Sequence, residues 1–168
     1  MSKKKTVAAP SDTETRATSS HAQELRLWLR MLACTNLIEG EIRTRLRNQF
    51  SITLPRFDLM AQLERAPDGM KMGELSKRMM VTGGNVTGIT DQLVAEGLVV
   101  RQDNPKDRRA YNVKLTAEGR KAFMKMAAAH EKWIVDLLGH LSEKENEQLY
   151  QLLAKLKSHV SSLPVEGY

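Results

Sequence analysis

Apolar residues recur at helical spacing over the first third of the chain. Residues 24–49 contain no proline and a single glycine, so they predict one long helix. Its first half is apolar on more than one face, whereas its second half carries one stripe that includes Ile42 and Leu46. A helix that is apolar on several faces must be covered on several sides. In a small protein this indicates a subunit interface as well as a core.

Three shorter helices are predicted between residues 53 and 96. The first begins near Pro55, a residue type that suits a first helical turn. The second covers residues 72–80, and the third covers residues 85–96 after a tight turn. Thr82 lies in that turn and is a suitable residue to cap the third helix.

Two short strands are predicted next. Residues 98–101 are mostly apolar, and apolar and polar side chains alternate over residues 110–115 with a period of two. The polar residues 102–109 separate them and predict a hairpin tip. The hairpin therefore follows directly on the short helices.

Two longer helices complete the predicted elements. Thr116 is expected to cap a helix that runs to about residue 138. Ser142 and Glu145 have the spacing of a capping box at the start of the last helix. Leucines recur along that helix as far as Val160 and form a continuous apolar stripe.

This order of elements predicts a mainly α protein of six helices with a small β-hairpin wing. Two short helices joined by a tight turn and followed by a hairpin have the layout of a winged helix-turn-helix. The hairpin is the wing, and the helix over residues 85–96 takes the place of the recognition helix.

Charge narrows the class of partner. The formal net charge of +6 and the pI of about 9.5 favour a polyanion, either nucleic acid or an anionic membrane. Cys34 is the single cysteine, so no disulfide forms within the chain and a cytoplasmic location is expected. No apolar run approaches the roughly 20 residues that a membrane span needs. No apolar stretch follows the lysines at residues 3–5, and we expect no secretory signal.

The helix over residues 85–96 has a polar face suited to the major groove of DNA, which requires slim and polar side chains. Asn85, Thr87 and Gly88 meet that requirement, and Thr82 stands at the start of the helix. An asparagine can hydrogen-bond an adenine edge in pairs, and a threonine offers a hydroxyl and a methyl group. An ordinary surface helix carries similar residues, so this face alone leaves both interpretations open.

The hairpin tip favours DNA. Arg108 and Arg109 are predicted at a protruding turn beside Lys106, and a narrow minor groove attracts inserted arginine. Asp107 has the spacing to hold the guanidinium of Arg109 in a bidentate pair. A winged helix that makes only protein contacts remains the alternative.

Motifs at residues 72–76, 85–87, 96–99, 107–109 and 115–119 resemble the MarR family of bacterial regulators. The resemblance covers about residues 24–160. It implies a homodimer whose interface is formed by the first, fifth and last helices. It also implies that each subunit places its fourth helix in the major groove and its wing arginine in the minor groove.

Matched residue by residue, Asp107 is the wing aspartate of the family, Arg109 is the arginine inserted in the groove, and Arg108 is the variable position between them. The chain departs from the family at Gly83 and Gly84, where many relatives have a serine or threonine that contacts phosphate. Polar composition predicts a disordered basic tail (1–20). The resemblance divides the rest of the chain into an N-terminal dimerisation helix (21–50), a winged helix-turn-helix DNA-binding domain (51–115), C-terminal dimerisation helices (116–162) and a tail (163–168).

The resemblance further implies a transcriptional regulator, more commonly a repressor. Docking of two such helices in the major groove predicts a palindromic operator whose half-site centres lie about 10 base pairs apart. Family members often respond to small aromatic carboxylates or their coenzyme A thioesters. An apolar, methionine-rich site with a cation for the carboxylate would suit such an effector. The candidate residues are Trp28, Met31, Asn36, Arg43, Arg56, Phe57 and Met60. The alternative is that their apolar members belong to the core.

Other chemistries are less well supported by the sequence. Some family members respond to oxidants through cysteine, and Cys34 is the one candidate for such a role; we expect it to be structural, because a sensor needs an exposed thiolate near positive charge. The sequence contains no glycine-rich phosphate loop, metal-ligand cluster or nucleophile motif, so we expect no enzymatic activity, no metal and no cofactor.

Overall fold

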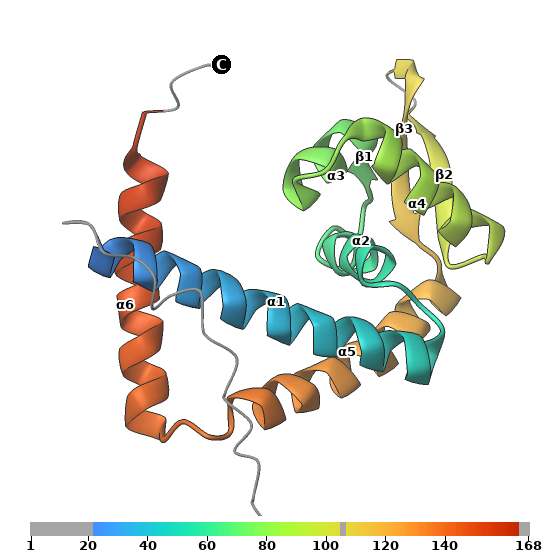
Figure 1. Cartoon of the computed structure of the whole chain (residues 1–168). Helices are drawn as coiled ribbons and strands as arrows, with labels where there is room; N and C mark the ends of the chain where they lie inside the picture. Colours follow the sequence, from blue (N-terminus) through green and yellow to red (C-terminus); the bar gives the residue numbers. More distant parts are fainter. Residues whose placement is uncertain (1–21, 105–106, 165–168) are drawn as a thin grey trace, which may run out of the picture. The chain divides into compact units, whose positions relative to one another are not determined.

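The computed structural model describes residues 22–104 and 107–164, with side chains described for residues 23–102 and 111–164. Within these ranges the chain forms six helices and one three-stranded sheet, as the sequence predicted for the helices (Figure 1). The elements are α1 (Ala22–Phe50), α2 (Leu54–Glu64), β1 (Met70–Lys71), α3 (Met72–Met79), α4 (Gly83–Ala95), β2 (Val99–Asn104), β3 (Asp107–Leu115), α5 (Ala117–Leu138) and α6 (Glu143–Ser162). They divide into two compact units, residues 1–54 and 55–168.

The first unit contains α1, whose two halves differ as the pattern predicted. In the second half Ile42 and Leu46 are buried. Ser51 follows the helix with a positive φ of 54°, and its N–H donates to the Arg47 carbonyl at 3.0 Å. The first half leaves large apolar side chains exposed in the single chain, namely Leu25, Leu27, Trp28 and Leu32, and Leu37 just beyond its end is exposed as well.

The second unit contains the sheet, in which β3 lies between β1 and β2 and both pairings are antiparallel. The predicted two-stranded hairpin was incomplete, because Met70 and Lys71 add a third strand by pairing with Val113 and Asn112. A strand of only two residues is too short to show an alternation of apolar and polar positions in the sequence. Gly69 makes this pairing possible, since its φ is +89° and a Cβ there would lie 2.9 Å from the Val113 carbonyl oxygen.

The strands of the wing are also longer than predicted. Residues 102–104 and 107–109, assigned to a polar tip, belong to β2 and β3, and the register shifts between Asp103 and Asn104. Strand pairing uses backbone groups, so polar side chains do not prevent it. The turn itself, at Pro105 and Lys106, lies outside the described residues.

The core of the second unit joins α2, α3, α4, the sheet and α5. The ring of Phe57 on α2 lies 5.5 Å from that of Phe123 and 5.1 Å from that of His130, both on α5. Burial in this cluster lowers the pKa of His130. Each large apolar side chain buried here stabilises the fold by about 1.5–3 kcal/mol. The buried residues are Phe57, Leu59, Met60, Leu63, Met70, Leu75, Val86, Thr90, Leu93, Val99, Val113, Leu115, Gly119, Phe123, Met126 and Trp133.

Both predicted caps of the last helices are confirmed. The Thr116 hydroxyl accepts from the Gly119 N–H at 2.9 Å and donates to the Gly97 carbonyl at 2.7 Å, so it joins the end of α4 to the start of α5. Ser142 and Glu145 form the reciprocal capping box of α6. No helix within the described ranges is both long enough and apolar enough to cross a lipid bilayer.

The first turn of α5 lies directly against the residue that precedes β2. A Cβ at Gly119 would lie 1.8 Å from the carbonyl oxygen of Leu98, which is backbone and cannot rotate away. The Thr116 N–H also donates to that carbonyl, at 3.1 Å. Glycine at position 119 is therefore required for α5 to approach the base of the wing.

We expect Gly119→Ala to destabilise the protein by about 3 kcal/mol or more, because the added methyl group overlaps a backbone oxygen. Urea unfolding at matched protein concentration measures the change. Gly73→Ala is the control, since nothing lies within 4 Å of a Cβ at that helical position, and it should be neutral or stabilising by up to about 1 kcal/mol. Equal stability of the two variants would contradict this account of the α5 contact.

Candidate nucleic-acid interface

The turn between α3 and α4 is held from the α3 side. Met80 has a left-handed backbone with φ of 54°, and its N–H donates to the Lys77 carbonyl at 3.2 Å. The Val81 N–H donates to the Ser76 carbonyl at 3.2 Å. The Ser76 hydroxyl in turn donates to the Val81 carbonyl at 2.6 Å. These bonds fix where α4 begins.

The helix α4 begins two residues earlier than predicted, at Gly83, and includes both glycines of the predicted turn. Thr82 is the N-cap residue, as predicted, but its side chain makes no capping hydrogen bond, so the predicted side-chain role was wrong. The Thr82 carbonyl accepts from the Val86 N–H at 3.2 Å. A backbone hydrogen bond therefore begins the helix, and the exposed Thr82 side chain is left available for another contact.

The two faces of α4 are sharply different. Val86, Thr90 and Leu93 are buried, and the Thr90 hydroxyl is satisfied by donating to the Val86 carbonyl at 2.8 Å. Ile89 and Val94, which flank this buried face, are half-buried. The opposite face is polar and exposed, and it consists of Gly84, Asn85, Thr87, Gly88, Asp91 and Gln92.

Three of the predicted interface residues are thus exposed on the part of α4 that is not packed against the core: Asn85, Thr87 and Gly88. The Thr87 hydroxyl donates to the Gly83 carbonyl at 2.9 Å, which leaves its lone pairs and methyl group toward solvent. Nothing lies within 4 Å of a Cβ built at Gly83, Gly84 or Gly88. Packing within the chain therefore gives no reason for these three glycines.

The wing adjoins this face at its base. Arg101 on β2 forms an ion pair with Asp91 on α4, and its guanidinium carbon lies 5.1 Å from the ring centroid of Tyr111 on β3. Sequence reasoning missed this contact, because the two charges are ten positions apart on different elements, a helix and a strand. The backbone of Asp107, Arg108 and Arg109 belongs to β3, but the side chains of these three predicted residues lie outside the described part of the structure.

The candidate effector residues fall into both units, each of which is described by itself. On α1, Trp28 and Asn36 are exposed, Met31 is half-buried, and Arg43 pairs with Glu39 at 3.3 Å. Cys34 on the same helix is exposed in the single chain, and its structural role stays a prediction.

In the second unit, Phe57 and Met60 are buried in the core, the alternative that the sequence left open. The largely buried side chain of Arg56 on α2 forms an ion pair with Glu96 at the end of α4. No group of three or more histidine, cysteine, aspartate or glutamate side chains in the described residues is arranged to hold a metal ion.

The α3–α4 pair, its exposed polar face and the adjoining wing define a winged helix-turn-helix protein. The sequence profile of the MarR family matches residues 52–111. The chain is 33% identical over 93 residues to the uncharacterized HTH-type transcriptional regulator YkoM of Bacillus subtilis, an alignment that covers 55% of this chain and 60% of that regulator. The chain thus spans less than two thirds of this curated relative.

Solved structures extend the similarity along the chain. A MarR family transcriptional regulator from Silicibacter pomeroyi is 32% identical, with a TM-score of 0.70, over 88% of this chain and 100% of that one. A mutant of E. coli MarR solved in complex with operator DNA has the same fold, with a TM-score of 0.71 at 24% identity over 83% of this chain and 99% of that one. This chain belongs to the MarR family.

Ser76 and Thr82 allow a test of how the α3–α4 turn is held. We expect Ser76→Ala to cost about 1 kcal/mol, because the Val81 carbonyl loses its hydrogen bond. Thr82→Ala should cost less than about 0.5 kcal/mol, because the Thr82 side chain makes no capping bond. Thermal and urea unfolding measure both changes. A larger loss for Thr82→Ala than for Ser76→Ala would show that the turn is held by the cap instead.

Proposed function

We propose that the protein is a cytoplasmic transcriptional regulator that binds double-stranded DNA in a sequence-specific way through α4 and the wing. One observation carries the proposal: α4 has Gly83, Gly84 and Gly88 although nothing in the described part of the chain lies within 4 Å of a Cβ built at any of them. Gly83 and Gly84 lie in the first turn, whereas Gly88 lies inside the helix, where a glycine costs up to about 1 kcal/mol relative to alanine. A DNA duplex lying against α4 would account for that cost, because DNA can approach a helix more closely where the helix has no side chain.

The residues around these glycines have assigned roles in this proposal. Asn85 and Thr87 read base edges in the major groove. Thr82 and the N–H groups of the first turn of α4 contact a phosphate, where the positive end of the helix dipole favours an anion. On the wing, Arg109 enters the minor groove, Asp107 orients its guanidinium and Arg108 lies beside them. The relatives described as transcriptional regulators support this assignment.

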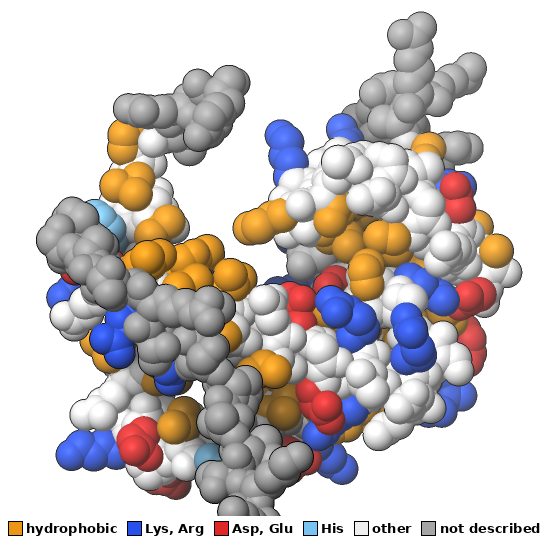
Figure 2. Space-filling view, viewed as in Figure 1, with side chains coloured by type: hydrophobic (Ala, Val, Ile, Leu, Met, Phe, Trp, Pro, Cys, Tyr) orange, Lys and Arg blue, Asp and Glu red, His pale blue; other side chains and the backbone are white. Residues whose placement is uncertain are grey.

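We further propose that the protein acts as a homodimer through α6 and the first half of α1. Not one of the 20 residues of α6 is buried in the single chain. Leu149, Leu152, Leu153, Leu156 and Val160 are all exposed, and apolar side chains lie at the surface over α6 in Figure 2. A stripe of this length requires a cover.

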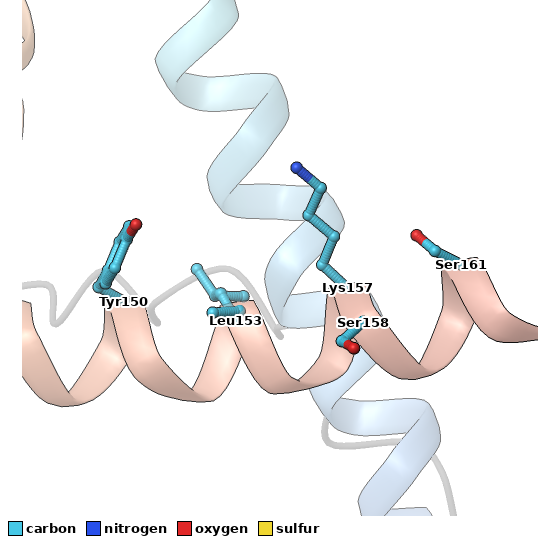
Figure 3. Close-up of a pocket in the computed structure, with 6 residues that line it drawn as sticks. Tyr150, Leu153, Lys157, Ser158 and Ser161 are labelled. Atoms are coloured by element: carbon cyan, nitrogen blue, oxygen red, sulfur yellow. The ribbon is translucent and has the colours of Figure 1, made fainter.

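Figure 3 shows the same helix at closer range, with Tyr150, Leu153 and Lys157 projecting from one side and lining a surface hollow. A second copy supplies an identical stripe, so apolar side chains would meet apolar side chains across a two-fold axis. Such a dimer would read a palindromic operator whose half-sites lie about one helical turn apart.

We expect Arg109→Ala to weaken binding to a selected duplex by about 1–3 kcal/mol, the loss of one groove contact. The duplex is the one that the wild-type protein selects from a pool with a randomised centre. Arg65→Ala is the control, because Arg65 is an exposed arginine outside the proposed interface. Gel shifts over a range of salt concentrations measure both variants.

Binding to DNA should weaken steeply as the salt concentration rises, because phosphate contacts release counterions. A winged helix that makes only protein contacts would select no duplex and show no such salt dependence. Arg109→Ala and Asn85→Ala variants that both bind like the wild type would contradict the assigned site.

We also propose that the regulator is a repressor and that a small aromatic carboxylate or its coenzyme A thioester releases it from DNA. Arg43 and Arg56 already hold the carboxylates of Glu39 and Glu96, so either cation suits an acidic ligand. The candidate contacts are Trp28, Met31 and Asn36 for a site on α1, and Phe57 and Met60 for a separate site on α2. The effector must bind the DNA-free state more tightly than the DNA-bound state.

We expect benzoate, substituted benzoates or their coenzyme A thioesters to release the selected duplex in a fluorescence anisotropy titration, whereas acetate at the same concentration should not. Failure of every aromatic compound would contradict the effector assignment and leave DNA binding intact. Release of the duplex by peroxide from the wild type but not from Cys34→Ser would instead support the redox alternative. Cys34 is exposed in the single chain, so an oxidant can reach its thiol there.

A further inference from the structure

One guanidinium connects three elements at the base of the wing. Arg101 on β2 pairs with Asp91 on α4 and lies over the ring of Tyr111 on β3. The hydrogen bond to Asp91 raises the pKa of Arg101. The Arg101 side chain is about one-third exposed and that of Asp91 about half exposed, so the pair lies at the surface.

The strand register explains how Arg101 reaches both partners. Arg101 is opposite Val113, and Asp103 is opposite Tyr111, so Arg101 and Tyr111 are diagonal neighbours on one face of the hairpin. Stacking on the ring directs the guanidinium along that face. Arg101 thereby holds both strands of the hairpin as well as α4.

The position of Asp91 relates this contact to the proposed DNA-binding face. Asp91 lies one helical turn beyond Thr87 and Gly88 on the exposed side of α4. A free carboxylate there would repel the phosphates of a duplex bound to that face. The pair with Arg101 neutralises the carboxylate and directs it toward the wing.

A hairpin attached to α4 at one point can rotate about that point, whereas a second attachment fixes the angle between the hairpin and α4. The chain joins α4 to β2 at residues 96–98, where the Leu98 N–H donates to the Leu93 carbonyl at 3.0 Å. Arg101 adds a second attachment three residues further along the strand, about 10 Å away at the rise of a β-strand. Rotation of the hairpin about its base must break the Arg101–Asp91 pair.

We propose that Arg101 and Asp91 are positioning residues that fix the angle between the wing and α4, and so set the spacing between the minor-groove and major-groove contacts. This inference rests on the proposed DNA-binding function. It assigns sequence discrimination to two residues that need not touch a base. Partly exposed ion pairs contribute little to folding stability, so the variants that test it should fold.

The test is a double-mutant cycle with Asp91→Ala, Arg101→Ala and the double variant in the full chain. The probe is the duplex selected by the wild type, and single-base changes at every position give the base preference of each variant. Arg109→Ala identifies the positions read by the wing, and Asn85→Ala identifies those read by α4. Thermal unfolding of every variant checks that it is folded.

We expect each single variant to bind the selected duplex about 2- to 30-fold more weakly. Preference should fall at the positions assigned to the wing and be retained at those assigned to α4. The double variant should lose no more than the weaker-binding single variant, because both residues act through one contact. Glu41→Ala, which removes the comparable Arg45–Glu41 pair on α1, should leave binding and preference unchanged.

Four results would overturn the inference. A uniform loss across all sequences in Arg101→Ala, with additive losses in the double variant and a salt slope reduced by about one, would make Arg101 a phosphate contact. Tighter binding by Asp91→Asn would mean that the carboxylate acts only by repulsion. Wild-type behaviour of the Asp91 and Arg101 variants, while Arg109→Ala is impaired, would refute this inference alone. A wild-type protein that selects no duplex would refute the proposed function as well.

Discussion

Burial of one face of α4 is the constraint on which the proposed interface depends. Val86, Thr90 and Leu93 are withdrawn from solvent, so the side that carries Asn85 and Gly88 must face outward. Thr90 is buried although it is polar, because its hydroxyl donates a hydrogen bond to the Val86 carbonyl of the same helix. Packing of the core therefore determines which side of α4 faces outward, and that side is the proposed DNA-binding surface.

The same logic connects the sheet to the long helix that follows it. Thr116 bonds both the end of α4 and the first turn of α5, and Gly119 lets that turn approach the Leu98 carbonyl. On the other side of the core, Phe57 packs against Phe123 and His130. The second unit thus holds α4, the wing base and α5 through short contacts that leave little freedom. The proposed DNA contacts require such fixed positions.

The exposed apolar side chains set a different kind of requirement. A single chain leaves the leucine stripe of α6 and the first half of α1 in water. With a second copy over these surfaces, folding and assembly become linked, and the apparent stability depends on protein concentration. An effector that changes how the copies meet could then change the distance between two recognition helices without touching DNA.

The sequence by itself determined the elements that depend on local interactions. Helical periodicity located all six helices, and the caps at Thr116 and Ser142 follow from hydrogen bonds within a few residues of each cap. The exposed residues of α4 could be predicted for the same reason, since Asn85 and Gly88 are three residues apart and share a side of any regular helix, and Thr87 is adjacent to Gly88.

Only the tertiary structure decided the features that depend on residues far apart in the chain. β1 exists because Met70 and Lys71 meet β3, some forty residues later, through backbone groups that have no sequence signature. Burial of Thr90, the absence of a side-chain cap at Thr82 and the contact of Arg101 with Asp91 and Tyr111 likewise follow from which surfaces meet. A periodic pattern states which residues share a face, but it cannot state what that face touches.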